Sequence, residues 1–345
     1  MKTHLLTVSA THPEPDVIAA AAACIAVGEL VAMPTETVYG LAADAHNPVA
    51  VARIFAAKGR PTTDPLIVHI ADIDQLAAVA TDYPPAYSLL AEAFWPGPLT
   101  MLLPRHRSLN STITAGFDTV AVRMPAHPVA LALIRACGTP LVAPSANLFS
   151  HPSPTTAAHV VHDLDGRIAM VLDAGACRIG VESTIVDITQ TPAVILRQGD
   201  VSAEQLTTVL GEVMVLQRTL ATSQAAPAPG MLLKHYAPRT PLRLLRGPAA
   251  AVQQAVAQIH RQQHTIWLCY AEDEAYAQHL GIATFSLGAV SDGAQIARSL
   301  FAALRAADAA GYAVIVVAEP NGTGVAAAVR DRLFRAAEGV IHTVE

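Results

Sequence analysis

Two basic residues flank a glycine in the segment Lys58-Gly59-Arg60, directly after a run with helical character. The chain has only three lysines, at positions 2, 58 and 234, among 22 basic residues. A lysine in so arginine-rich a chain indicates a place where a compact ammonium is needed rather than a planar guanidinium. Gly59 allows a sharp bend, so the two cations are placed to clamp a di- or triphosphate. An exposed basic turn without a ligand is an equally good interpretation of these three residues.

A second polar signal, Ser145-Ala146-Asn147, follows the apolar run Leu141-Val142-Ala143. This run has the composition of a short strand, so the polar residues lie at its carboxyl end. In open α/β sheets ligands bind at that edge. Ser and Asn offer short donors and acceptors to a phosphate, a ribose or an amide. The same residue types also cap turns, and that alternative stays open.

Hydroxyl groups and one carboxylate cluster in Pro34-Thr35-Glu36-Thr37-Val38-Tyr39-Gly40, again after a predicted strand. This set suits the recognition of a small polar substrate. A helix N-cap formed by Thr35 or Thr37 is the competing interpretation.

Several other chemistries have no motif in the chain. There is no phosphate-binding GxxxxGK[ST] loop, no HExxH and no GxSxG. The segment Gly322-Thr323-Gly324 lacks the third glycine of a dinucleotide fingerprint and is interpreted as a helix start. His159 and His162 are three residues apart without a third ligand, so a helix-end pair is favoured over zinc.

Composition favours a protein of two ordinary domains, because 345 residues with 52% hydrophobic and 14% charged residues can build two cores. The net charge of −6 argues against extensive nucleic-acid coating, although a local basic cleft is compatible with it. Four scattered cysteines without a CxxC pair are typical of reduced thiols in the cytoplasm. The apolar run Val17–Val27 is too short to cross a bilayer, so no membrane association is expected.

The order of apolar runs and breaks predicts a mixed sheet with helices in the first two thirds. Helices are expected over 16–27, with Asp16 as N-cap, and over 48–57. The proline-rich stretch 222–230 predicts a linker. Short apolar strands alternate with helical stretches after it, which is typical of a small parallel-sheet domain. The predicted boundaries are 1–216, a linker of 217–240, and 241–345.

Taken together, the segments resemble the YrdC/YwlC-type threonylcarbamoyl-AMP synthases in their long two-domain form. The resemblance rests on an ordered set of motifs over nearly the whole chain: PTETVYGLAADA (34–45), KGRPTTDPLIVHI (58–70), FWPGPLTMLLP (94–104), VAVRMPAHP (120–128), APSAN (143–147), PSPTTAAHV (152–160), ESTIVD (182–187), ILRQG (195–199), KHYAP (234–238) and GTGVAAAVRDRL (322–333). It implies a YrdC-like twisted mixed sheet with a basic concave cleft and a small Rossmann-like second domain.

The resemblance also implies an activity: L-threonine, bicarbonate and ATP form threonylcarbamoyl-adenylate and pyrophosphate, with Mg²⁺ expected beside the ATP. The product would pass to the tRNA threonylcarbamoyl transferase machinery, which modifies adenosine 37 of tRNAs that read ANN codons. The residues implied for ATP and the carbamate are Lys58, Arg60, Ser145 and Asn147, with Thr62, Ser153, Arg197 and Tyr236 for the nucleotide, the last as part of a linker lid. Those implied for L-threonine are Thr35, His69, Thr119, Arg123, Ala143 and Thr184. Neither a general base nor a metal ligand follows; Glu36 and Glu182 are the candidates.

Three residues depart from the family pattern: Asp64 stands where Asn is usual, and Ser150 and Ala174 where Gly is common. Asp64 is expected to add negative charge beside the phosphate clamp. The alternative function is a non-catalytic RNA-binding or ribosome-maturation module that uses the same basic concavity, with weak RNA binding. Carbamoyl transfer in metal-centre maturation is a third hypothesis, but the zinc-finger cysteine pairs that go with it are missing from the chain.

Overall fold

The computed structural model of the chain describes residues 2–216, 226–231, 233 and 235–345. The chain divides into two compact units. The first consists of Met1–Phe149 and Ser153–Leu232, and the second of Ser150–Pro152 and Leu233–Glu345. The three residues Ser150–Pro152 group with the second unit because Ala237 N–H donates to the Ser150 carbonyl and Arg305 to the Pro152 carbonyl.

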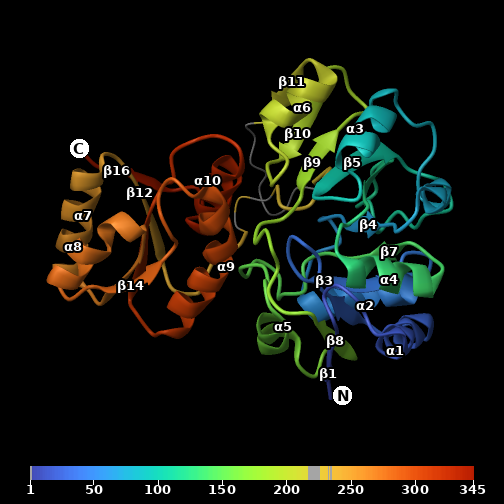
Figure 1. Cartoon of the computed structure of the whole chain (residues 1–345), viewed down its shortest axis with the longest axis horizontal. Helices are drawn as coiled ribbons and strands as arrows, with labels where there is room; N and C mark the ends of the chain where they lie inside the picture. The colour runs from blue at the N-terminus through green and yellow to red at the C-terminus, as the bar shows by residue number, and fades with distance from the viewer. Residues whose placement is uncertain (1, 217–225, 232, 234) are drawn as a thin grey trace. The chain divides into compact units, whose positions relative to one another are not determined.

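The first unit is built on a sheet of eleven strands in the order β1-β8-β2-β3-β7-β4-β6-β5-β9-β10-β11 (Figure 1). Neighbouring strands pair in parallel in five places and antiparallel in the other five, so the sheet is mixed. The strands are β1 (His4–Thr7), β2 (Val31–Met33), β3 (Gly40–Asp44), β4 (Ile67–His69), β5 (Leu99–Pro104), β6 (Thr119–Arg123), β7 (Leu141–Val142), β8 (Met170–Asp173), β9 (Thr184–Asp187), β10 (Ala193–Arg197) and β11 (Val213–Val215).

Both faces of this sheet are covered. Helices α2 (Pro48–Lys58), α3 (Ala86–Phe94), α5 (Ala157–Leu164) and α6 (Ala203–Leu210) pack on one face. Helices α1 (Pro15–Ala26) and α4 (Pro128–Cys137) pack on the other, over β2, β3, β7 and β8. Beyond these two helices the same face carries Ile67, Leu102, Ala121 and Ile185, and the linker residues Ala226, Ala228 and Met231 are buried against them. The linker therefore completes the cover of the sheet at the place where helices are missing.

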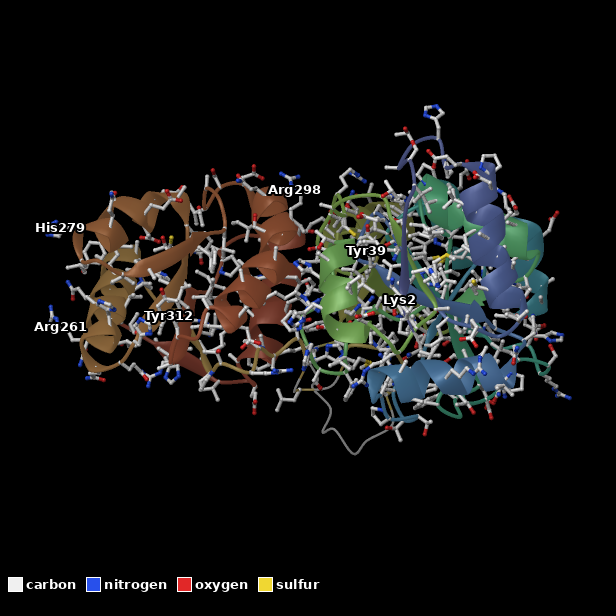
Figure 2. All side chains as sticks on the ribbon, turned by 90° about the horizontal axis from the view of Figure 1, so that it is seen from below. Lys2, Tyr39, Arg261, His279, Arg298 and Tyr312 are labelled. Carbon is white, nitrogen blue, oxygen red and sulfur yellow. The ribbon has the colours of Figure 1, made fainter. Side chains whose placement is uncertain are left out.

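The second unit has a smaller sheet, β14-β13-β15-β12-β16, in which every neighbouring pair is parallel. Its strands are β12 (Leu242–Arg246), β13 (Thr265–Cys269), β14 (Ala283–Ser286), β15 (Val314–Ala318) and β16 (Ile341–Thr343); its helices are α7 (Ala249–Gln262), α8 (Glu274–His279), α9 (Gly293–Ala309) and α10 (Val325–Ala336). Helices α7 and α8 cover one face through Val252, Val256 and Ala277. Arg261 and His279, in the last turns of these helices, project away from the sheet (Figure 2), where a positive charge suits the helix dipole.

The predicted fold class is confirmed, with a mixed sheet in the first unit and a wholly parallel sheet in the second. The segment 322–324 precedes α10, as its interpretation as a helix start predicts. The predicted N-cap of the first helix is wrong: Glu14 holds that position without a side-chain bond, and Asp16 lies in the first turn, because Pro15 begins the helix one residue earlier. None of the helices in the part of the chain that the structure describes is long and apolar enough to span a bilayer.

Candidate active site

Lys58 joins the two polar segments that the sequence singles out. It is the last residue of α2, and Gly59 ends that helix in the left-handed conformation with φ of 65°. The side chain is 2% exposed, and its Nζ donates to the carbonyls of Ser145 and Asn147 at 2.5 and 2.7 Å. Both of these acceptors are neutral carbonyls, and the ammonium also acts on the nearby Asp64 carboxyl, where burial raises the pKa and the charge of Lys58 opposes that rise.

The partner cation of the predicted clamp, Arg60, is arranged differently. Its Nε donates to the Asp64 carbonyl at 3.0 Å and its Nη2 to the Pro65 carbonyl at 2.6 Å. Nη2 also lies 3.0 Å from Oδ2 of Asp64, whose side chain is fully buried. Asp64 is therefore the counter-ion of Arg60, and Arg60 braces the turn 60–65. Burial raises the pKa of the Asp64 carboxyl, while the nearby cations Arg60, Lys58 and Arg197 oppose that shift.

The loop between β2 and β3 connects Lys58 to the rest of the site. Gly40 bridges to Ser145, and the Ala146 N–H donates to the Tyr39 carbonyl at 2.8 Å. On its other side the loop is held by residues 177–180, because the Ile179 N–H donates to the Glu36 carbonyl at 2.8 Å. The backbone that carries Thr35, Glu36 and Thr37 is thus fixed from both sides.

A row of polar side chains crosses three adjacent strands on the linker-covered face. His69 at the end of β4 is in register with Arg123 at the end of β6, and Arg123 with Thr100 of β5. Residues two apart on a strand share a face, so these three side chains continue the face formed by Ile67, Ala121 and Leu102. All three are buried, at 3%, 4% and 0% exposure. The sheet thereby gathers polar groups from sequence positions far apart.

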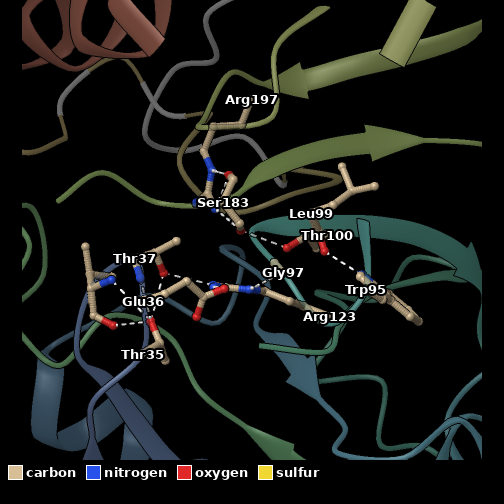
Figure 3. A network of polar contacts seen from close by, with 11 residues as sticks. Thr35, Glu36, Thr37, Trp95, Gly97, Leu99, Thr100, Arg123, Ser183 and Arg197 are labelled. Carbon is tan, nitrogen blue, oxygen red and sulfur yellow. Dashed lines mark hydrogen bonds and ion pairs between the residues drawn. The ribbon is translucent and has the colours of Figure 1, made fainter. Parts of the chain in front are cut away.

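Arg123 is the centre of this row, and its contacts fix its orientation (Figure 3). Nε donates to the Gly97 carbonyl at 3.1 Å and Nη1 to the Thr37 hydroxyl at 2.9 Å. Nη2 lies 2.6 Å from Oε1 of Glu36, in an ion pair whose side chains are 4% and 5% exposed. The Thr35 hydroxyl is 2.8 Å from that of Thr37 and donates to the Val38 carbonyl. A carboxylate lies against the guanidinium, which shows that Arg123 is oriented to bind one.

His69 stays neutral in this row. Complete burial and the adjacent Arg123 guanidinium lower the pKa of His69 to about 3. Its Nδ1 has no hydrogen-bond partner among the described residues. A neutral imidazole with a buried, unsatisfied nitrogen beside Arg123 is suited to a small polar ligand.

A second polar chain extends from Thr100 towards the linker. The hydroxyls of Thr100 and Ser183 are 2.8 Å apart, and Arg197 donates to the Ser183 carbonyl at 2.9 and 3.1 Å (Figure 3). Arg197 Nη1 also donates to the carbonyl of Pro229 in the linker at 3.4 Å. Within the first unit, the linker therefore contacts one of the residues predicted to bind ATP.

Ser153 lies in a separate buried contact with Glu182. The Ser153 hydroxyl is fully buried and donates to Oε1 of Glu182, which is 6% exposed. This contact brings a carboxylate next to another residue predicted to bind ATP.

The remaining predicted residues differ in how they are placed. Ala143 donates its N–H to the Ile67 carbonyl beside the His69 row, and Thr62 is exposed on the turn after Arg60. Thr184 uses its hydroxyl to donate to the Val201 carbonyl at 2.6 Å and pairs with Leu99, which packs in the core on the other face. Thr119 and Arg123 are the first and last residues of β6, and their side chains lie on the same face of the sheet. At about 3.3 Å per residue, their Cα atoms are about 13 Å apart.

Tyr236 belongs to the second unit, where it is buried. Its ring centroid lies 5.5 Å from that of Phe301 on α9. The guanidinium of Arg332, on α10, lies 5.2 Å from the same centroid. Its φ of 62° is in the left-handed region, which is uncommon for a non-glycine residue. Lys234 and residues 217–225 of the predicted linker lie outside the described residues.

Sequence reasoning did not single out Thr100 and Ser183, whose hydroxyl groups join the network. Thr37, from the predicted hydroxyl cluster, joins it through Arg123, and Asp64, which was expected beside the clamp, joins Arg60 in an ion pair. For Asp64 the spacing of four residues from Arg60 is a usable signal. For Thr100 and Ser183 no local signal exists, because their neighbours are set by strand register.

Known proteins resemble this chain over both units. Residues 23–199 match the family model Sua5_yciO_yrdC, described as telomere recombination, and residues 201–338 match the model of the threonylcarbamoyl-AMP synthase C-terminal domain. The threonylcarbamoyl-AMP synthase of Pyrococcus abyssi is 43% identical over 325 residues, covering 92% of each chain. That of Bacillus subtilis is 42% identical over 323 residues, covering 93% of each. The crystal structure of P. abyssi Sua5 complexed with L-threonine superposes with a TM-score of 0.92 at 40% identity, covering 99% of this chain and 100% of that one.

Proposed function

Because the chain belongs to the threonylcarbamoyl-AMP synthase family, we propose that it makes threonylcarbamoyl-AMP from L-threonine, bicarbonate and ATP, releasing pyrophosphate. In reaction terms this makes it a nucleotidyltransferase, since the adenylyl group moves from pyrophosphate to a carbamate oxygen.

One observation carries the proposal: a single loop, residues 34–40, connects two buried cations. Its Glu36 pairs with Arg123, and its Gly40 bridges to Ser145, whose carbonyl accepts a hydrogen bond from Lys58. An amino acid carries a carboxylate and an ammonium, which match the two charges of the Arg123–Glu36 pair. Triphosphate and carbamate are anions, which match the positive charge of Lys58. The loop holds the two kinds of subsite side by side.

The chemistry requires positioning more than a protein nucleophile. The carbamate oxygen attacks the α-phosphorus of ATP and pyrophosphate leaves, so the enzyme must align two anions and neutralise their charge. Lys58 and the residues Ser145 and Asn147 are assigned to this task. Thr119 lies along the same face as Arg123, at a distance that suits the nucleoside end of ATP rather than the amino acid.

Mg²⁺ fits this arrangement. The ion usually binds one or two protein carboxylates together with substrate phosphates, and no group of three or more potential ligand side chains occurs among the described residues. Glu182, buried beside Ser153, is the carboxylate that would hold it. When bound, the ion would neutralise charge on the phosphates.

The linker is assigned the role of a cover over the nucleotide. Its support is the burial of Ala226, Ala228 and Met231 on the site face and the bond from Arg197 to Pro229. Tyr236 follows in the same segment and is proposed to contribute to ATP binding.

The product is a mixed carbamic–phosphoric anhydride, an activated group donor. Its proposed use is transfer to adenosine 37 of ANN-reading tRNAs by the threonylcarbamoyl transferase machinery, in the cytoplasm.

The test is pyrophosphate release with each of the twenty amino acids, with and without bicarbonate. We expect release that depends on L-threonine and bicarbonate together. Steep salt-dependent RNA binding without any ATP consumption would favour the RNA-binding module instead.

A further inference from the structure

The proposed reaction needs a neutral amine, and His69, whose pKa is lowered to about 3, is a weak acceptor for the proton of the ammonium. At neutral pH an amino acid is an ammonium ion, which has no lone pair to attack the carbon of bicarbonate. Burial in the site cannot remove that proton without an acceptor nearby. The acceptor must lie close to the cation that binds the substrate carboxylate, because the two charges sit on one carbon of the substrate.

Glu36 meets this requirement by position. Its carboxylate is 2.6 Å from Arg123 Nη2, and its side chain is 5% exposed. Neither of its oxygens accepts a well-formed hydrogen bond from the described residues. Glu182, the other candidate carboxylate, accepts a hydrogen bond from the Ser153 hydroxyl.

From this geometry we propose that Glu36 binds the ammonium of L-threonine and accepts its proton. The inference rests on the proposed function and adds to it the role of a catalytic acid–base. Without substrate, Glu36 occupies the place on Arg123 that the substrate carboxylate takes. When that carboxylate arrives, Glu36 exchanges its guanidinium partner for the ammonium group.

The exchange leaves Glu36 beside the ammonium group that must lose a proton. A buried carboxylate paired with a guanidinium holds protons weakly, and the same carboxylate without it holds them more strongly. In a site of low dielectric constant the neutral pair of acid and amine is favoured over the ion pair. Arg123 thereby couples the binding of the substrate to the deprotonation of its amine.

The step balances as follows. The ammonium gives one proton to the Glu36 carboxylate, leaving the amine and a carboxylic acid. The amine nitrogen forms a bond to the carbon of bicarbonate, the carbon–hydroxyl bond breaks, and the second amine proton leaves with the hydroxyl as water. The carbamate then attacks ATP, and Glu36 returns its proton to solvent.

The charged and titratable groups around Glu36 come from several elements. Arg123 lies on β6, and His127 follows that strand; burial lowers the pKa of His127, and Glu36 opposes the shift. Cys177 comes from the loop after β8, where burial raises the pKa of its thiol to about 12, so it stays neutral. Asp200 follows β10, and burial raises its pKa against the pull of Arg178, with a smaller contribution from Glu36. Arg123 is the cation in direct contact with Glu36.

The test compares Glu36→Gln and Glu36→Asp with the wild type, and uses Glu29→Gln as a control. Glu29 is partly exposed and pairs with Arg53 outside the site, so this variant should keep the wild-type rate. At pH 7 we expect Glu36→Gln to lower kcat about 100- to 1,000-fold, in the range typical of a lost acid–base group. Its rate should then rise about tenfold per pH unit towards the pKa of the free threonine amine. Glu36→Asp should keep the shape of the wild-type pH profile, because it retains a carboxylate.

Two results would overturn the assignment. One is a Glu36→Gln enzyme with the wild-type kcat and pH profile. The other is a Glu36→Gln enzyme that melts at the wild-type temperature, yet whose lost activity does not recover at alkaline pH. If the wild type itself releases no pyrophosphate with L-threonine and bicarbonate, the proposed function fails instead, so the two failures are distinguishable.

Discussion

Lys58 and Arg123 are both buried cations of the proposed site, but they differ in the charge of the groups that contact them. The Nζ of Lys58 donates to two backbone carbonyls, which carry no formal charge. Arg123 is paired with Glu36, so that region is close to neutral. The difference matches the proposed ligands, a polyanion in the first case and a zwitterion in the second. It teaches that the partners of a buried cation, rather than its type, indicate the ligand.

Within this comparison, the largest effect is expected from removing the Lys58 ammonium. Lys58→Ala should lower kcat/KM for ATP by roughly 100-fold or more, because one preorganised charge in a buried site has about that effect. Pyrophosphate release under ATP titration is the measurement. Lys2→Ala, an exposed lysine in the same unit, is the matched control and should behave as the wild type. Near-normal turnover of Lys58→Ala would refute the role of Lys58.

A substitution of Arg123, which is assigned to the amino acid, should affect the binding of L-threonine more than that of ATP. Arg123→Lys keeps one positive charge but cannot reproduce the contacts to Gly97, Thr37 and Glu36 together. We expect the KM for L-threonine to rise roughly 10- to 100-fold, as for lost charged hydrogen bonds. ATP affinity should stay within about twofold. Arg53→Lys serves as the control; equal losses for both substrates would contradict the division of the site.

A third neutralised region, the Arg60–Asp64 pair, allows a pH test. The pKa of Asp64 is raised above its ordinary value of 3.8, so the folded state binds this proton more tightly than the unfolded chain. The stabilisation is therefore present at low pH and is lost as the pH rises through the raised pKa. Asp64→Asn should remove this contribution, so its Tm should change less between pH 4 and pH 8 than that of the wild type.

Melting curves of the wild type and of Asp64→Asn between pH 4 and pH 8 test this prediction. Parallel pH dependences in the two proteins would show that Asp64 does not titrate as described.

The smallest effect is expected at Thr119. Thr119→Ala should leave the KM for L-threonine within about twofold, because the residue lies about 13 Å along β6 from Arg123. Any loss should fall on ATP. A tenfold rise in the KM for L-threonine, measured beside Arg123→Lys, would place Thr119 in the amino-acid pocket after all.

Local patterns were enough for the class of fold. Apolar runs of strand length, the break at 222–230 and the strand–helix alternation after it predict a mixed sheet followed by a parallel one. Both sheets are present. Local rules were less reliable where residues compete for one position, as at Asp16, where Pro15 decides the start of the helix.

The site residues were predictable to different degrees. Lys58, Ser145 and Asn147 stood out as rare or strand-end residues, and the fold joins them by direct hydrogen bonds. Asp64 was expected to place negative charge beside the clamp; its carboxyl pairs with Arg60, and Lys58 and Arg197 also oppose the rise in its pKa that burial causes. Thr100 and Ser183 have no distinguishing local pattern.

The sequence by itself determined the element types, the family and the backbone turns, because these depend on neighbouring residues and on short motifs. Only the tertiary structure decided which charges are compensated. Strand register and loop packing bring Glu36 to Arg123. They also bring Lys58 to two carbonyls that lie 87 and 89 residues further along the chain. Burial then sets the charge state of each group, and burial exists only once the sheet and its linker cover are assembled.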